Sequence, residues 1–181
     1  MNAAVQSTVD WPLQIHRALR AANVSIVGYV PDAGHKRLIE LCQAEKDVRS
    51  VVLTTEEEGI GLVSGAWLGG AKSALLMQSS GVGNCINALG MVKVCRFPLL
   101  MLVTMRGEQG EFNPWQVPMG QATGASLESM GVAVQRIERP DAAGTTIEAA
   151  ARRAFGECAA VAVLIAQQMI GIKSFQEQTN Q

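Results

Sequence analysis

The feature that most constrains the fold is the alternation of short, continuously apolar segments with longer amphipathic ones. The apolar segment 24–29 (VSIVGY), for example, precedes the segment 34–45, where Leu38, Ile39, Leu41 and Cys42 recur at helical spacing. Strands that are apolar on both faces and alternate with helices are typical of a parallel sheet with helices on each side. We therefore predict a three-layer α/β/α fold around a six-stranded parallel sheet.

The same pattern assigns each expected element a range of residues. The strands are expected at 24–29, 50–53, 73–77, 98–104, 132–137 and 161–165. The helices are expected at 10–22, 34–45, 56–68, 84–94, 117–130 and 145–158. Asp10 is the predicted cap of the first helix, and Thr145 or Thr146 that of the last. No linker divides the chain, so one domain is expected over 1–181, with the polar segment 174–181 as a frayed tail.

Composition and charge exclude several classes of protein. The chain has 181 residues, of which 48% are hydrophobic and 17% charged, which is enough apolar material for a sizeable core. A net charge of −1 and an aromatic content of 4% weigh against a nucleic-acid partner. The longest apolar runs fall far short of the roughly 20 residues of a membrane-spanning helix, and no secretion signal stands out. We expect a cytoplasmic protein with no membrane partner.

The cysteines and histidines give no strong catalytic pattern. The four cysteines form no CxxC pair, so we expect free, buried thiols and no zinc or redox site. His16, beside two arginines in the first predicted helix, is expected at the surface. His35 follows the first strand near Asp32, where it serves either as an acid or base or as a surface cap, the second being favoured. No Ser/His/Asp set supports hydrolysis.

Ligands of a parallel sheet bind beyond the carboxyl ends of its strands, which selects four loops: 30–35, 54–58, 78–87 and 105–121. The run 54–58 (TTEEE) fits either a helix cap with an acidic first turn or a functional carboxylate. The small residues of 78–84 (QSSGVGN) predict either a flexible crossover or a loop that contacts phosphate or substrate. In the long polar loop 106–116, Arg106 either holds an anion by a forked contact or is solvated.

Taken in order, these segments resemble the pyrimidine-binding (PYR) domain of thiamine-diphosphate enzymes. The resemblance covers roughly residues 10–170 and is greatest to the alpha subunits of sulfopyruvate decarboxylase, with phosphonopyruvate decarboxylase as a near relative. It is carried by VPD (30–32), TTEEEG (54–59), LMQSSGVGN (76–84), NAL (87–89) and MRGE (105–108).

The resemblance implies a role for Glu56, because the family has a glutamate nine residues before a helix glycine, here Gly65. That spacing selects Glu56 over Glu57 and Glu58. Its carboxyl group is expected to hydrogen-bond N1′ of the cofactor's aminopyrimidine and favour the imino tautomer, which takes the proton from the thiazolium C2. The family also implies cofactor contacts from Ser80, Gly81, Gly83 and Asn84.

The GDG motif, through which these enzymes bind diphosphate and Mg²⁺, is absent from the sequence. The resemblance therefore implies a separate beta subunit that carries this motif, with no metal ligand in this chain. We expect a larger hetero-oligomer with contacts between copies of this chain, and activity only with the partner. A rival interpretation is a non-catalytic α/β binding or regulatory protein.

The substrate implied by the resemblance is sulfopyruvate, converted to sulfoacetaldehyde and CO₂; phosphonopyruvate or another 2-oxo acid is the alternative. Arg106 is the first candidate to hold the anionic group, with Gln116 and Asn84 as polar support. Asp32 and His35 are second candidates, because the first loop approaches the substrate in the wider family. Met105 stands where the family often has histidine.

Overall fold

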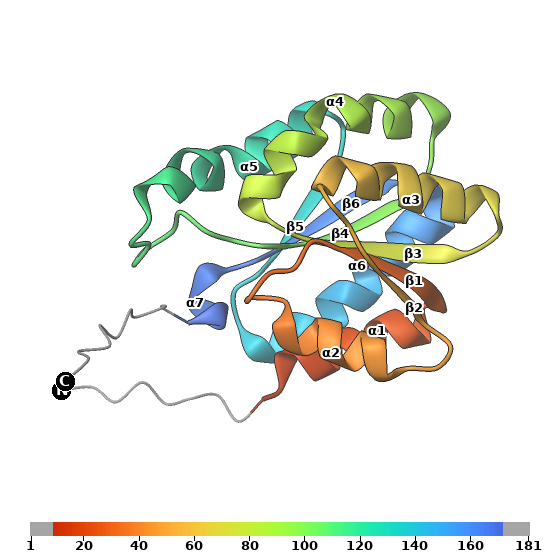
Figure 1. Cartoon of the computed structure of the whole chain (residues 1–181), viewed down its shortest axis with the longest axis horizontal. Coiled ribbons are helices and arrows are strands. Elements are labelled where there is room, and N and C mark those ends of the chain that lie inside the picture. The colour runs from red at the N-terminus through yellow and green to blue at the C-terminus, as the bar shows by residue number, and fades with distance from the viewer. Residues whose placement is uncertain (1–8, 172–181) are drawn as a thin grey trace.

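The computed structural model of the chain describes residues 9–171. Its centre is one six-stranded sheet in which every pair of neighbouring strands is parallel (Figure 1). The strands are β1 (Val24–Tyr29), β2 (Arg49–Val52), β3 (Lys72–Gln78), β4 (Leu99–Thr104), β5 (Ala133–Ile137) and β6 (Ala160–Ile165). Their order across the sheet is β2-β1-β3-β4-β6-β5. The predicted fold class is confirmed, and every predicted strand is present within one or two residues of its expected bounds.

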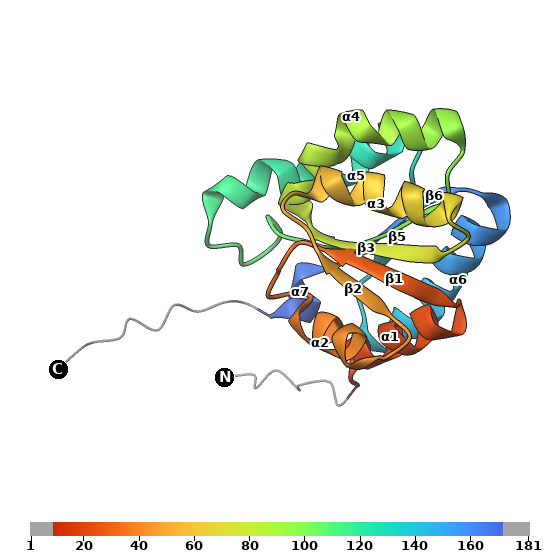
Figure 2. The same cartoon turned by 45° about the vertical axis from the view of Figure 1, so that its right-hand side comes forward.

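Helices cover both faces of the sheet (Figures 1 and 2). One face carries α1 (Trp11–Ala21), α2 (Lys36–Ala44) and α6 (Ala143–Glu157). The other carries α3 (Glu56–Leu68), α4 (Ser79–Cys95) and α5 (Val117–Ser129), and a short α7 (Gln167–Ile170) follows the last strand. Single turns of 3₁₀ helix at Pro114–Gln116 and Pro140–Ala142 lead into α5 and α6.

Two apolar clusters, one on each side of the sheet, form the core. Successive strand residues alternate between them: Ala74 and Leu76 pack toward α1, α2 and α6, whereas Leu75 and Met77 pack toward α3, α4 and α5. All six residues of β4 are buried, as expected of a central strand covered on both faces.

Helix α4 begins earlier than predicted, and this corrects the assignment of 78–84 as a loop. Ser79 starts the helix, so the small residues that follow it form the first turns. Serine and glycine are weak helix formers, but burial of Ser79, Gly81 and Val82 against the rest of the fold outweighs that preference. Helix α6 likewise begins at Ala143, so Thr145 and Thr146 lie inside it rather than at its cap.

The predicted cap of the first helix is confirmed, because Asp10 Oδ1 accepts a hydrogen bond of 3.2 Å from the Leu13 amide. His16, expected at the surface, is buried, with Nε2 3.5 Å from Glu45 Oε1. Desolvation lowers its pKa below the usual value. His16 lies on the side of the amphipathic helix α1 that faces the core, so it is buried although charged residues neighbour it in the sequence. The expectation of buried thiols holds for two cysteines and is wrong for the other two, Cys95 and Cys158, which are exposed.

The segment 174–181, predicted to fray, lies outside the described residues. Within residues 9–171, no helix combines the length and apolar character needed to cross a membrane.

Candidate active site

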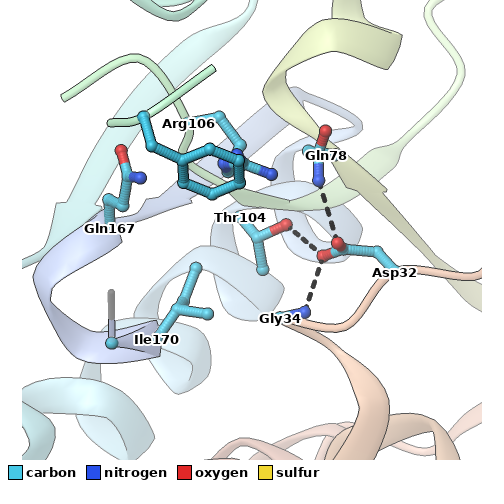
Figure 3. Close-up of a pocket in the computed structure, with 9 residues that line it drawn as sticks. Asp32, Gly34, Gln78, Thr104, Arg106, Gln167 and Ile170 are labelled. Carbon is cyan, nitrogen blue, oxygen red and sulfur yellow. Dashed lines mark hydrogen bonds between the residues drawn. The ribbon is translucent and has the colours of Figure 1, made fainter. Parts of the chain in front are cut away.

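Polar side chains converge at the carboxyl ends of the three central strands. Asp32 follows β1, Gln78 ends β3 and Thr104 ends β4. The Asp32 carboxylate accepts hydrogen bonds from Gln78 Nε2 (2.9 Å), Thr104 Oγ1 (2.6 Å) and the Gly34 amide (3.1 Å), and these converge on it in Figure 3. The three groups line one pocket together with Arg106. The tendency of ligands to bind at the carboxyl ends of parallel strands thus predicted the location of this site. It singled out neither Gln78 nor Thr104.

Glu56 lies at the same edge of the sheet, on the neighbouring element. It is the first residue of α3 and is half-buried, whereas Glu57 and Glu58 are exposed. Asn84 Nδ2, from α4, donates a 2.9 Å hydrogen bond to Glu56 Oε2. Glu58 closes the helix start instead, because its Oε2 accepts from the Thr54 amide at 2.8 Å. The three consecutive glutamates therefore have different environments, and Glu56 is the one that accepts a hydrogen bond from α4.

The α4 backbone makes room for the Glu56 side chain at Gly81. A Cβ atom added to Gly81 would lie 2.3 Å from Cγ, Cδ and Oε1 of Glu56. Any other residue at this position would displace the carboxylate, so the glycine is a steric requirement of the Glu56 position. Two of the residues predicted to bind cofactor, Gly81 and Asn84, thus contact Glu56.

Ser80 and Gly83, the other two predicted cofactor contacts, are exposed residues in the first turns of α4. Ser80 Oγ donates to Gln78 Oε1 at 3.0 Å, and Gln78 in turn donates to Asp32. This series of hydrogen bonds connects the start of α4 to the pocket around Asp32.

Arg106 does form a forked contact, but with a carboxylate of its own loop. Its Nε and Nη2 atoms donate to the two oxygens of Glu111, each at 2.6 Å. The Glu111 side chain is only 1% exposed, and it also accepts from the amides of Gly107 and Asn113. Chiefly because of the Arg106 hydrogen bonds, the pKa of Glu111 is lowered to about 2. The same contact raises the pKa of Arg106.

Sequence reasoning missed Glu111 and Gln167. Gln167, the first residue of α7, donates from Nε2 to Glu111 Oε2 at 2.9 Å. It also exchanges two hydrogen bonds with Glu108: the Glu108 amide donates to Gln167 Oε1 and the Gln167 amide donates to Glu108 Oε2. These contacts fix the loop after β4 against the end of β6. The tendency of ligands to bind at the carboxyl ends of parallel strands would have indicated Gln167 if applied to the last strand.

His35, predicted to cap at the surface or to act beside the substrate, is fully buried and is not among the pocket residues. The imidazole is turned inward, toward the backbone of β4. Its Nε2 lies 3.1 Å from the Leu102 carbonyl oxygen and therefore donates, while Nδ1 is buried with no partner within residues 9–171. Burial lowers the pKa of His35. The histidine is thus a neutral core residue as the structure stands.

Gln116 and Met105 also lie outside the pocket around Asp32. Gln116 is half-buried at the start of α5, outside the pocket that Arg106 lines, and its Oε1 has no partner within the described residues. Met105 is buried in the apolar cluster beneath α3, α4 and α5.

The part of the chain that the structure describes holds no metal site beside these groups. Within residues 9–171, no three His, Cys, Asp or Glu side chains are grouped so as to hold a metal ion. The site therefore offers a positioned carboxylate and hydrogen-bonding groups, and nothing in the described part that would neutralise a diphosphate through a metal.

Comparison with known proteins assigns the chain to a family. No protein-family model matches it. It is 39% identical over 152 residues to the sulfopyruvate decarboxylase subunit alpha of Methanococcus maripaludis, a match that covers 83% of this chain and 91% of the relative. The chain belongs to the family of sulfopyruvate decarboxylase alpha subunits. Its members are subunits of thiamine-diphosphate-dependent carboxy-lyases.

Longer relatives contain this subunit as one part. The sulfopyruvate decarboxylase of Methanosarcina acetivorans is 34% identical over 115 residues, which are 63% of this chain and 29% of that protein. The phosphonopyruvate decarboxylase of Streptomyces viridochromogenes is 33% identical over 112 residues, 61% of this chain and 28% of that protein. The matched stretch therefore covers under a third of each of these enzymes.

A solved structure shares the fold. The 2-oxoglutarate:ferredoxin oxidoreductase from Magnetococcus marinus superposes with a TM-score of 0.74 at 16% identity, covering 93% of this chain and 31% of that one. At this identity the likeness establishes the fold alone.

The residues of this family member fit one half of thiamine diphosphate. A carboxyl group held at a sheet edge by Asn84, with the α4 backbone recessed at Gly81, matches the donor and acceptor needs of an aminopyrimidine. Nothing in the described residues matches the needs of the diphosphate and its Mg²⁺.

Proposed function

We propose that this chain is the alpha subunit of a decarboxylase that converts sulfopyruvate to sulfoacetaldehyde and CO₂, with Glu56 as the carboxyl group that bonds N1′ of the aminopyrimidine. One observation carries the residue assignment: the half-buried Glu56 carboxylate packs against α4, where Asn84 donates a hydrogen bond to it and Gly81 leaves space for it, whereas Glu57 and Glu58 are exposed. The family relationship supports the reaction.

Thiamine diphosphate, when bound, supplies the carbon nucleophile and stores the electrons released as CO₂ leaves. The task of Glu56 is to hold a proton at the pyrimidine ring. Asn84 engages Oε2, so Oε1 remains the oxygen that can share a proton with N1′. Gly81 and Asn84 together restrict the carboxylate, and a fixed orientation is what such a proton contact requires.

We assign the diphosphate and Mg²⁺ to a beta subunit. The sequence has no GDG motif, and residues 9–171 contain no cluster of metal-ligating side chains. The longer relatives, of which this chain matches under a third, support a partner polypeptide that completes the site.

The charge of the pocket determines how it could hold an anionic substrate. Arg106 and Glu111 cancel one another, and the Asp32 carboxylate lies in the same pocket. Two of the five guanidinium N–H groups of Arg106 are used by Glu111, which leaves the others to donate to a sulfonate together with Gln78. We therefore propose that Arg106 orients the anionic group, and that the partner subunit supplies the remaining positive charge.

The test is to co-express the chain with a beta subunit that carries the GDG motif and to measure CO₂ release from sulfopyruvate, phosphonopyruvate and pyruvate with thiamine diphosphate and Mg²⁺. Glu56→Gln should lower kcat by at least about 100-fold, because the amide cannot hold the proton. Glu57→Gln is the matched control: this exposed neighbour should retain wild-type activity.

If the complex prefers phosphonopyruvate, the proposed substrate is wrong and the proposed role of Glu56 stands. A complex that releases no CO₂ from any of the acids would favour the non-catalytic alternative. Damage by Glu57→Gln rather than Glu56→Gln would refute the residue assignment.

A further inference from the structure

Two side chains set the charge of the pocket around Asp32 (Figure 3). Among the described residues that line this pocket, Arg106 is the only cation and Asp32 is the only anion. The other polar side chains of the lining belong to Gln78, Thr104 and Gln167, and none of them is charged. The groups that donate hydrogen bonds to Asp32 are also uncharged, so they do not cancel the charge of its carboxylate.

Glu111 cancels the charge of Arg106 without lining the pocket. Its side chain is only 1% exposed, and both its oxygens accept hydrogen bonds of 2.6 Å from the guanidinium. The pKa of Glu111 is lowered to about 2, mainly by these hydrogen bonds, so the carboxylate stays charged at any pH near neutrality. The pair is therefore neutral as a whole, and the charge left in the described part of the pocket is that of Asp32.

The other groups around this pair do not change that balance. Glu108, on the same loop, forms an ion pair with Arg136 instead. His35 lies near Asp32, but its burial lowers its pKa, so the imidazole is neutral at pH 7. The Phe112 ring, which also lines the pocket, is uncharged, and its centre lies 5.5 Å from Cζ of Arg106.

Glu111 also decides which edge of the guanidinium can bind a ligand. It occupies the edge formed by Nε and Nη2 of Arg106. A guanidinium has five N–H groups in one plane, so those at the end formed by Nη1 and Nη2 can still donate. An anionic group in the pocket would thus bind to a guanidinium that already shares its charge with a carboxylate. One negative charge on the ligand suits this arrangement better than two.

Sulfonate and phosphonate groups differ in charge at neutral pH. A sulfonate carries one negative charge, whereas a phosphonate, like a phosphate monoester, takes up its second charge at roughly pH 6–7. We propose that Glu111 is a specificity-determining residue, which acts through Arg106 to favour a singly charged sulfonate over a doubly charged phosphonate. The proposal rests on the proposed function, because it takes Arg106 as the residue that holds the anionic group. The second charge of a phosphonate would be repelled by both Glu111 and Asp32.

The experiment compares three variants in the complex with the beta subunit. Glu111→Gln removes the charge and keeps an oxygen that can accept from Arg106. Glu111→Asp keeps the charge. Glu108→Gln is the matched control, because it removes a negative charge from the same loop at a residue that pairs with Arg136 and does not line the pocket. Circular dichroism checks that each variant folds.

Two quantities are measured at pH 6.5 and pH 8. Calorimetry gives the dissociation constants of sulfopropionate and phosphonopropionate, which lack the keto group and therefore do not react. Release of CO₂ gives kcat/KM for sulfopyruvate and phosphonopyruvate. Each result is expressed as the preference for the phosphonate over the sulfonate, because a ratio cancels any change that affects both ligands equally.

We expect Glu111→Gln to raise the preference for the phosphonate at pH 8 by at least about tenfold. Glu111→Asp and Glu108→Gln should change it by less than threefold. In the wild type, this preference should fall between pH 6.5 and pH 8, as the phosphonate gains its second charge. A wild-type preference that stays constant or rises over this range would overturn the proposal without the use of any variant.

Equal losses for both ligands in Glu111→Gln would show that the residue only supports the loop, and the same shift in Glu111→Asp would show that geometry rather than charge is responsible. Either result would overturn the proposal. If Glu111→Gln leaves the preference unchanged in a complex that decarboxylates sulfopyruvate, the proposal is wrong and the proposed function stands. If the dissociation constants shift as expected in a complex that releases no CO₂, the proposal is supported and the proposed function is wrong.

Discussion

Replacing Glu111 by glutamine isolates the contribution of the buried carboxylate that holds the loop after β4. The folded protein lowers the pKa of Glu111 from 4.5 to about 2, mainly through the fork from Arg106. At about 1.4 kcal/mol per pKa unit, that shift corresponds to roughly 3 kcal/mol if none of it is screened. The cost of removing both charged groups from water offsets part of this gain, so the expected loss is about 1–2 kcal/mol. For a chain of this size, the Tm should fall by about 2–8 °C at pH 7.

The stabilisation by Glu111 should decrease as the pH falls. Because the folded pKa is lower than the unfolded one, the ionised form of Glu111 stabilises the fold above about pH 4.5 and ceases to do so as pH falls toward 2. The gap in unfolding free energy between wild type and Glu111→Gln should therefore be largest at pH 7 and shrink below pH 4.5. Urea unfolding at pH 7 and pH 3, followed by circular dichroism, measures it.

A matched control is Glu157→Gln, which changes an exposed glutamate 3.7 Å from Arg153 on α6. It should leave stability within about 0.5 kcal/mol of wild type. The reasoning would be refuted by a Glu111→Gln protein as stable as wild type at pH 7, or by a gap of equal size at pH 7 and pH 3.

Two further predictions concern buried titratable groups. Burial lowers the pKa of His35, so the fold should lose stability as pH falls below about 6.5, and His35→Gln should make the change in unfolding free energy between pH 7.5 and 5.5 shallower; an unchanged slope would contradict this. Burial also raises the pKa of Cys42 to about 11 and that of Cys85 to about 12. In the native chain at pH 8, a thiol reagent should therefore modify the exposed Cys95 and Cys158 and spare the other two until the protein is denatured, as mass spectrometry would reveal.

The sheet was predictable from the sequence because its strands are buried on both faces. Such strands are continuous apolar runs, and the sequence of β4 (LLMLVT) is typical of a strand buried on both faces. The start of α4 was not predictable from local preference, since its serines and glycines favour a loop. Its position depends on contact between Gly81 and Glu56, which are brought together only by the folded sheet.

The sequence was enough to predict which loops form the site, but not which of their side chains contact one another. Glu56 was indicated by its place after a strand and by the family spacing, and its three-dimensional setting separates it from Glu57 and Glu58. The ion pair of Arg106 with Glu111 joins two residues within an irregular loop, where no periodicity indicates which charges meet. The available signal was one arginine followed by two glutamates in the segment 106–111 (RGEQGE). The contact of Gln167 with Glu108 joins the start of α7 to the loop after β4 and is decided by tertiary structure alone.

The most direct test of the central claim, that Glu56 activates the bound cofactor, is the rate at which the C2 proton of thiamine diphosphate exchanges with deuterium in the complex with the beta subunit. Rapid quenching followed by proton NMR measures this rate without substrate, so it does not depend on which 2-oxo acid is used. We predict that Glu56→Gln slows the exchange by at least about 100-fold while the cofactor stays bound, and that Glu57→Gln leaves it unchanged. Equal exchange rates in wild type and Glu56→Gln would contradict the account.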